Sequence, residues 1–243
     1  MILLRSALFN AYFVALTLLL GLAGVGFRLL SPGRIPGLTR FWVRAVVGAA
    51  RVICGIRFRV VGLDRLPPGP CLIAARHQSA YDALVWMLLA PRCCYVLKRE
   101  LTRIPLVGPL IVRMGMIVVD RERGATAMRA LLRQADRAVR EGRQIVIFPE
   151  GTRAPDQRLL PLQPGVAAIA ARTGLPVFPV VTDAWRVWGR RAFRKRPGVV
   201  RFVILPPIEA GLAREELMRR LSTALSATPA EVTPPEDAAA RGA

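Results

Sequence analysis

A stretch of 22 residues near the amino terminus, from Ser6 to Phe27, carries no charged side chain. As a helix it would extend about 33 Å, enough to cross a hydrocarbon core of about 30 Å. Arginine precedes the stretch once and follows it repeatedly, at positions 5, 28, 34, 40, 44 and 51. If the segment spans a membrane, this bias places the rest of the chain in the cytoplasm. A cleaved signal peptide fits poorly, because the apolar stretch is long and its end lacks a convincing small-x-small cleavage site.

A second amphipathic helix is predicted from Leu38 to Cys54. Its apolar side chains recur on one side and its arginines on another, which is typical of a basic helix lying at a membrane interface. An ordinary surface helix packed on the core would show the same pattern, and the two helices could either cross a membrane or lie in one leaflet. We therefore expect residues 1–56 to form an N-terminal membrane-associated two-helix segment ahead of the main domain, residues 57–226.

The main domain alternates short apolar runs with helical patterns, which predicts an α/β layered fold. The expected strands are 57–61, 72–75, 95–98, 116–119, 145–148, 177–181 and 199–205. The expected helices are 83–89, 106–113, 124–142, 164–173 and 212–226. Residues 227–243 are rich in Pro, Ala and acidic residues and are predicted to be a disordered tail.

The formal net charge of +20 calls for an anionic partner: a nucleic acid, an anionic membrane or a phosphorylated substrate. Tryptophan beside arginine, from Trp185 to Arg196, suits a lipid headgroup layer and would also suit RNA. The apolar amino terminus favours the membrane, so no nucleic-acid partner is expected. The four cysteines lack metal-ligand spacing, and with a single histidine in the chain no metal site is expected.

That single histidine, His77, lies between an apolar run and a helix. Asp82 follows one turn into the helix and could accept the Nδ1–H of the imidazole, leaving Nε2 free as a base. The sequence Ser79-x-x-Asp82 also fits a capping box, in which the carboxylate bonds to the backbone of Ser79. The residues alone leave both roles open for Asp82.

Three further blocks follow the His77-x4-Asp82 pair: KREL at 98–101, FPEGTR at 148–153 and VFPV at 177–180. In this order and spacing they resemble the glycerolipid acyltransferase family, most closely the bacterial 1-acyl-sn-glycerol-3-phosphate acyltransferases. The resemblance covers roughly Val60 to Leu212. Arg76 is a departure from it, since many members carry Asn or Lys before the histidine.

The resemblance implies a glycerol-3-phosphate acyltransferase-like α/β sandwich around a mixed sheet. It also implies that His77, oriented by Asp82, deprotonates the sn-2 hydroxyl of a lysophospholipid as that oxygen attacks an acyl thioester. The co-substrate would be acyl-CoA or acyl carrier protein, with no other cofactor. The residues expected to bind the acceptor and its phosphate are Lys98, Arg99, Glu150, Gly151, Thr152 and Arg153, and those expected near the acyl donor are Phe178 and Pro179. Glu150 could instead form an ion pair with Arg153 or Arg99.

Other functions remain open at this stage. The acceptor could be another lysolipid, such as a lyso-ornithine lipid, and a thioesterase could use His77 to activate water. A serine hydrolase is disfavoured, because the chain has no G-x-S-x-G motif. The arginines on the predicted helix 124–142 form either a solvated face or a contact for anionic lipid or acyl carrier protein. The expected location is the bacterial inner membrane, with the catalytic domain facing the cytoplasm.

Overall fold

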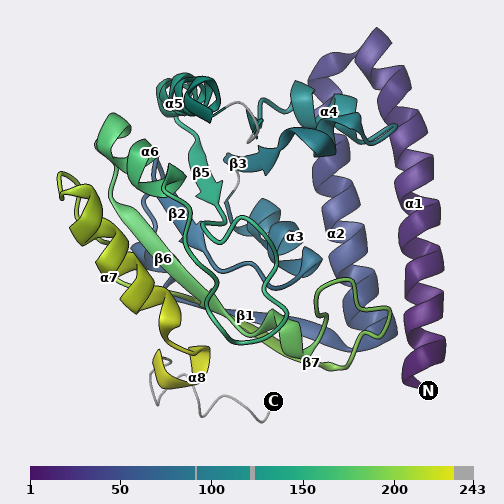
Figure 1. Ribbon diagram of the computed structural model, residues 1–243. Helices are drawn as coiled ribbons and strands as arrows, with labels where there is room; N and C mark the ends of the chain where they lie inside the picture. The colour runs from purple at the N-terminus through teal and green to yellow at the C-terminus, as the bar shows by residue number, and fades with distance from the viewer. Residues whose placement is uncertain (91, 121–123, 233–243) are drawn as a thin grey trace.

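The computed structural model describes residues 1–90, 92–120 and 124–232 and forms a three-layered α/β structure with a pair of long helices along one side (Figure 1). The strands are β1 (Ile56–Val61), β2 (Leu72–Ala75), β3 (Cys93–Lys98), β4 (Ile117–Val119), β5 (Gln144–Ile147), β6 (Val177–Thr182) and β7 (Gly198–Ile204). The helices are α1 (Ile2–Leu30), α2 (Ile35–Cys54), α3 (Ala80–Leu89), α4 (Gly108–Arg113), α5 (Gly124–Arg140), α6 (Gly165–Thr173), α7 (Arg214–Ser226) and α8 (Pro229–Val232).

The strands form one sheet in the order β1-β7-β6-β2-β5-β3-β4. All neighbouring pairs are parallel except β6 and β7, which are antiparallel. The mixed sheet predicted from the family resemblance is therefore confirmed. In its centre β2, β5 and β3 are adjacent and parallel, so their carboxyl ends meet at the same edge of the sheet.

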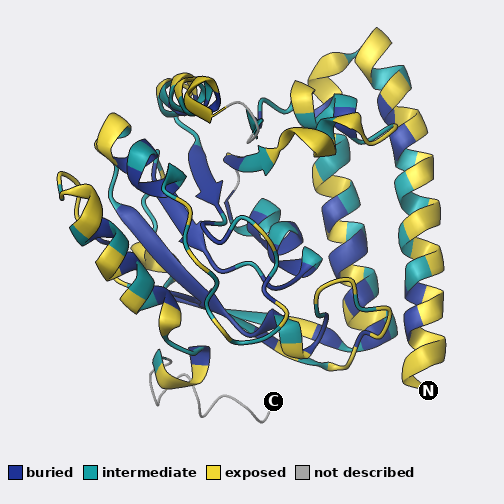
Figure 2. Ribbon diagram, viewed as in Figure 1, coloured by how far each residue is buried: buried dark blue, intermediate teal, exposed yellow. Residues whose placement is uncertain are grey.

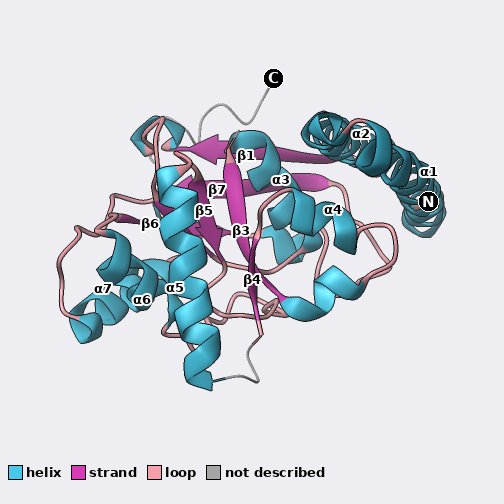
Figure 3. Ribbon diagram, turned by 90° about the horizontal axis from the view of Figure 1, so that it is seen from above, coloured by secondary structure: helices cyan, strands magenta, loops and turns pink. Residues whose placement is uncertain are grey.

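Helices cover both faces of this sheet (Figure 3), and a hydrophobic core lies on each face. One joins the sheet to α1, α2 and α3 and includes Phe9, Val46, Trp86 and Phe202. The other joins it to α5, α6 and α7 and includes Leu131, Val166 and Leu221. Successive residues of β2 point to opposite faces, so Ile73 belongs to the first core and Leu72 to the second.

The two amino-terminal helices share the first core and do not form a separate unit. Phe9 of α1 and Val43 of α2 are fully buried, and α1 runs beside α2 along its length (Figure 1). The boundary expected after residue 56, between the helix pair and the main domain, coincides with the start of β1. The hydrophobic core nevertheless continues across it. The outer face of α1 stays exposed and apolar (Figure 2), and by length and composition this helix could cross a membrane.

The predicted elements differ from the observed ones mainly at their ends. The helix expected from Ala83 starts three residues earlier, because Ser79 caps it. The tail expected to be disordered begins with the short helix α8, and the rest of that expectation, residues 233–243, lies outside the described residues.

Candidate active site

The site lies where the three central parallel strands end. His77 follows β2, Lys98 is the last residue of β3, and Phe148 follows β5. The backbone turns sharply after β5 at Gly151, which has a φ of 67° and so adopts a conformation that favours glycine. Blocks that are far apart in the sequence therefore meet at one edge of the sheet.

The imidazole of His77 is held on two sides. Its Nδ1 atom lies 3.3 Å from Oδ2 of Asp82, and its ring stacks on Phe148 with 4.0 Å between centroids. The same Asp82 oxygen accepts hydrogen bonds of 2.7 Å from the backbone N–H groups of Gln78 and Ser79. Asp82 therefore closes the capping box and faces the imidazole at once. With Nδ1 engaged, Nε2 is the nitrogen left to act as a base.

The backbone of His77 is fixed by the loop after β5. Its N–H donates a 2.9 Å hydrogen bond to Oε2 of Glu150, and its carbonyl accepts a 2.7 Å bond from the N–H of Ala154. Oε1 of Glu150 faces Nη2 of Arg76 at 3.5 Å, with both side chains fully buried. Burial raises the pKa of Glu150, while the His77 N–H and the Arg76 charge act against that shift.

Glu150 is thus an internal hydrogen-bond acceptor and the partner of Arg76. Neither alternative ion pair expected for it, with Arg153 or Arg99, is formed, since the carboxylate points into the core beneath His77. The guanidinium of Arg76 also donates to the carbonyls of Gln157 and Arg158, at 2.8 and 2.7 Å. The sequence alone assigns no role to Arg76. Its position directly before the only histidine was the available signal.

A cavity of about 620 Å³ opens in front of His77. Its polar wall includes Lys98, Gly151, Thr152, Arg153 and also Arg191, which lies in the loop after β6. Among the described residues that line this cavity, three have basic side chains (Lys98, Arg153 and Arg191) and none is a carboxylate. Such a wall is suited to an anionic group. Within the part of the chain that the structure describes, no cluster of three or more metal-binding side chains is found.

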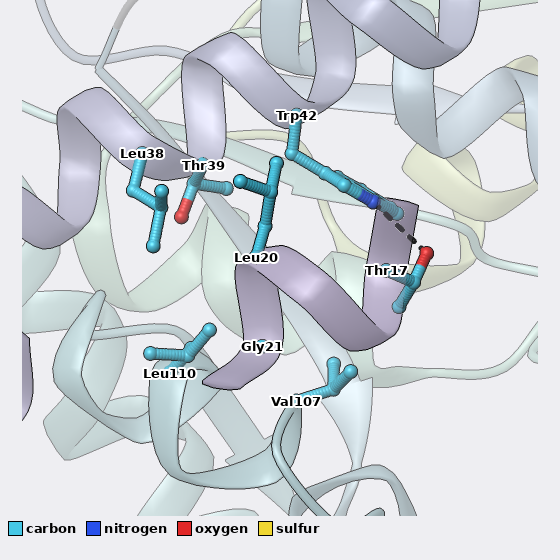
Figure 4. Close-up of a pocket in the computed structure, with 8 residues that line it drawn as sticks. All are labelled: Thr17, Leu20, Gly21, Leu38, Thr39, Trp42, Val107 and Leu110. Atoms are coloured by element: carbon cyan, nitrogen blue, oxygen red, sulfur yellow. Dashed lines mark hydrogen bonds between the residues drawn. The ribbon is translucent and has the colours of Figure 1, made fainter. Parts of the chain in front are cut away.

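The remaining wall of the cavity is apolar and reaches the amino-terminal helices. Phe13 of α1, Trp42 of α2, Leu84 of α3 and Ile111 of α4 contribute to it. A smaller cavity of about 60 Å³ adjoins it and shares Thr39, Trp42, Val107 and Leu110 with it. Figure 4 shows that this smaller cavity lies between α1, α2 and the segment around α4, with Trp42 donating a 3.0 Å hydrogen bond to Thr17. The site thus combines a cationic end with an apolar end.

Four of the expected binding residues do not line this cavity: Arg99, Glu150, Phe178 and Pro179. The chain turns into a 3₁₀ helix (Arg99–Arg103) directly after Lys98, and Nη1 of Arg99 instead lies 2.6 Å from Oδ2 of Asp120. Phe178 and Pro179 are buried within β6, where they pair in register with Ile73 and Ala74 of β2. A central strand has both faces covered, so these two side chains support the sheet behind the site.

Comparison with known proteins identifies the family of the chain. Residues 57–183 match the acyltransferase family. Over 197 residues the chain is 34% identical to a 1-acyl-sn-glycerol-3-phosphate acyltransferase of Pseudomonas aeruginosa, covering 79% of this chain and 77% of that protein. Over 133 residues it is 37% identical to the human 1-acyl-sn-glycerol-3-phosphate acyltransferase beta, covering 54% of this chain and 48% of the human protein.

A solved structure shares the fold. The 1-acyl-sn-glycerophosphate (LPA) acyltransferase PlsC from Thermotoga maritima superposes with a TM-score of 0.73 and covers 93% of this chain and 95% of its own. The two sequences are 23% identical. The match leaves 7% of this chain uncovered, which is fewer residues than α1 alone contains, so the shared fold includes at least part of the helix pair.

Proposed function

The chain belongs to the acyltransferase family, and we propose that it moves a fatty acyl group from an acyl thioester to the sn-2 hydroxyl of lysophosphatidic acid. The product is phosphatidic acid, a step of phospholipid biosynthesis. One observation carries the proposal: a single cavity holds an Asp-supported histidine, three cations and a long apolar wall. These parts match a base, a phosphate site and a track for acyl chains.

The geometry supports direct transfer without an acyl-enzyme. Nε2 of His77 takes the proton of the acceptor hydroxyl while that oxygen attacks the thioester carbonyl carbon. Asp82 stabilises the resulting imidazolium through Nδ1. The carbon–sulfur bond then breaks, and the imidazolium returns its proton to the departing thiolate. Arg153 lines the same cavity and binds the acceptor phosphate, which holds the hydroxyl close to His77.

The test is thiol release from acyl-CoA by the detergent-purified full chain, with and without lysophosphatidic acid. We expect acceptor-dependent release that His77→Ala abolishes while its circular dichroism spectrum stays that of the wild type. Thiol release that needs no acceptor would show that the protein is a thioesterase and not a transferase. If acyl-CoA is inactive, acyl carrier protein thioesters and other lysolipids, including lyso-ornithine lipid, identify the donor and acceptor.

We also propose that the protein binds the cytoplasmic face of the inner membrane through α1 and α2. Leu18, Leu19 and Leu22 on α1 are each more than half exposed, and an apolar face of this length requires lipid to cover it. The opposite face of α1 packs on the domain, from Phe9 near one end to Gly24 against Leu110 near the other. Lipid therefore cannot surround α1 on all sides, which favours insertion into one leaflet over crossing the membrane.

Co-sedimentation with vesicles of phosphatidylglycerol and phosphatidylethanolamine tests this attachment. Replacing Leu18 and Leu22 together by Ser should weaken sedimentation while leaving detergent activity close to wild type, because neither residue lines the catalytic cavity. Unchanged sedimentation of this variant would show that another part of the molecule attaches it to the membrane, such as the tryptophan- and arginine-rich loop after β6.

A further inference from the structure

The loop between β6 and β7 carries six cations, and one of them reaches the active site. Of Arg186, Arg190, Arg191, Arg194, Lys195 and Arg196, only Arg191 lines the catalytic cavity among the described residues. Arg191 has a φ of 52°, in the left-handed region that side chains other than glycine seldom adopt. Such a conformation persists where the surrounding structure imposes it, and it is often found at ligand sites.

The loop is held firmly on both sides of Arg191. The N–H of Arg196 donates a 2.8 Å hydrogen bond to the carbonyl of Val187 and closes the loop. Lys195 is buried, with its Nζ atom 2.6 Å from Oδ1 of Asn10 and 4.9 Å from the centre of the Trp188 ring. Since Asn10 belongs to α1, the first helix fixes the loop and so sets the position of Arg191.

The charges around Arg191 lack an acidic partner. Neither Arg191 nor Arg153 forms a salt bridge within residues 1–90, 92–120 and 124–232. Burial lowers the pKa of Arg153; the negative charge of Asp82 opposes this shift, and the nearby positive charges of Arg190 and Arg191 add to it. An anion that lies between two such arginines is bound strongly, because each guanidinium can donate two hydrogen bonds to phosphate oxygens.

We propose that Arg191 and Arg153 together bind the phosphomonoester of the acceptor lysolipid. Arg191 adds a positive charge to those of Arg153 and Lys98, and with it a preference for a dianionic phosphate over the monoanionic phosphodiester of other lysophospholipids. This inference rests on the proposed function, since it assigns a residue to the acceptor site of the same reaction.

Two other phosphates could meet these arginines, and chemistry favours the acceptor over both. The carbon that bears the acceptor hydroxyl is bonded to the carbon that bears the phosphate ester, so the phosphate must lie near His77, in the same cavity. The 3′-phosphate of CoA is separated from its thioester by the whole pantetheine arm. The headgroup of a bulk membrane lipid would lie outside the cavity that Arg153 and Arg191 line.

Arg191→Gly is the informative variant, because it removes the charge and tolerates the positive φ. Arg194→Ala is its matched control, an exposed cation of the same loop that does not line the cavity. Kinetics are measured in detergent without anionic lipid, varying lysophosphatidic acid, lysophosphatidylglycerol and acyl-CoA in turn. Loss of one charge-assisted phosphate contact should raise KM for lysophosphatidic acid roughly tenfold or more, with little change in kcat. The preference for lysophosphatidic acid over lysophosphatidylglycerol in kcat/KM should fall to a similar extent, and Arg194→Ala should match the wild type.

Calorimetric titration of lysophosphatidic acid into His77→Ala, with and without Arg191→Gly, tests binding independently of turnover. Weaker binding in the double variant supports the proposal. Equal binding, or a raised KM for acyl-CoA alone, overturns it and in the second case reassigns Arg191 to the donor. If the wild type has no acceptor-dependent activity, the proposed function is wrong. If the wild type is active and Arg191→Gly leaves that activity unchanged, only the role given to Arg191 is wrong.

Discussion

The backbone N–H of His77 donates a 2.9 Å hydrogen bond to Oε2 of Glu150, a carboxylate that has no exposed surface. The other oxygen of Glu150 faces the buried guanidinium of Arg76 and accepts the N–H of Leu160 at 3.2 Å. Arg76, His77 and the motif after β5 are therefore joined beneath the cavity. Glu150 holds the backbone of His77 in place, and its carboxylate does not line the cavity.

Glu150→Gln should destabilise the protein, because it leaves the buried charge of Arg76 without a counter-ion. Breaking a buried pair from one side typically costs about 3–5 kcal/mol, which would appear as a clear fall in the thermal unfolding midpoint. Combining it with Arg76→Met removes both charges and should recover part of the loss. A double variant no more stable than Glu150→Gln would show that the two residues are not coupled.

Asp82→Asn separates the two roles of Asp82. An amide oxygen can still accept the N–H groups of Gln78 and Ser79, but it carries no charge to stabilise the imidazolium of His77. We expect kcat to fall by roughly 10²–10⁴-fold, with the acceptor KM and the unfolding midpoint little changed.

Ser79→Ala is the matched control for that prediction. Its hydroxyl accepts the N–H of Tyr81 at 3.0 Å and does not line the cavity. Losing this cap should cost about 1 kcal/mol of stability while kcat stays close to wild type. A large loss of kcat in Ser79→Ala would mean that the capping geometry, and not the Asp82 charge, limits turnover.

Removing α1 should abolish folding and not merely membrane attachment. Deletion of residues 1–30 would expose the core around Phe9 and strip Lys195 of its contacts with Ser6 and Asn10. We expect aggregated protein on size-exclusion chromatography in detergent. The single substitution Phe9→Ala, which costs about 3–5 kcal/mol by cavity formation, should lower the unfolding midpoint of the full chain. A monomeric, folded truncation would show that the domain does not need the helix.

Much of the architecture could be predicted from the sequence, because strand and helix periods are local signals. The strand Leu72–Ala75, for example, has the bounds that the sequence predicts. The packing of α1 on the catalytic core could not be predicted, since an uncharged helix presents a similar sequence whether lipid or protein covers it.

The same limit applies to the polar residues of the site. Arg99, Arg153 and Arg191 are all arginines near motif or loop residues, and only the fold shows that Arg99 pairs with Asp120 while the other two face the cavity. Glu150 belongs to a recognisable motif, but its partner Arg76 lies 74 residues away in the chain. Such long-range pairs have no periodic signature.

The buried cysteines predict a loss of stability at alkaline pH. Burial raises the pKa of the Cys71 and Cys93 thiols from the ordinary value of 9.0 to about 12. Between these values the unfolded chain loses its thiol protons while the folded chain keeps them, so the folded state binds more protons. The free energy of unfolding should therefore fall as pH rises from about 9 towards 12, with the full contribution present below pH 9.

Urea unfolding in detergent at a series of pH values measures this effect, and Cys71→Ala tests its source. The variant starts from lower stability, because Cys71 is fully buried and its removal leaves a cavity. Its stability should nevertheless fall less steeply above pH 9 than that of the wild type, since one of the shifted thiols is gone. Parallel slopes for the two proteins would assign the alkaline loss to other groups, among them Tyr81, whose pKa burial also raises.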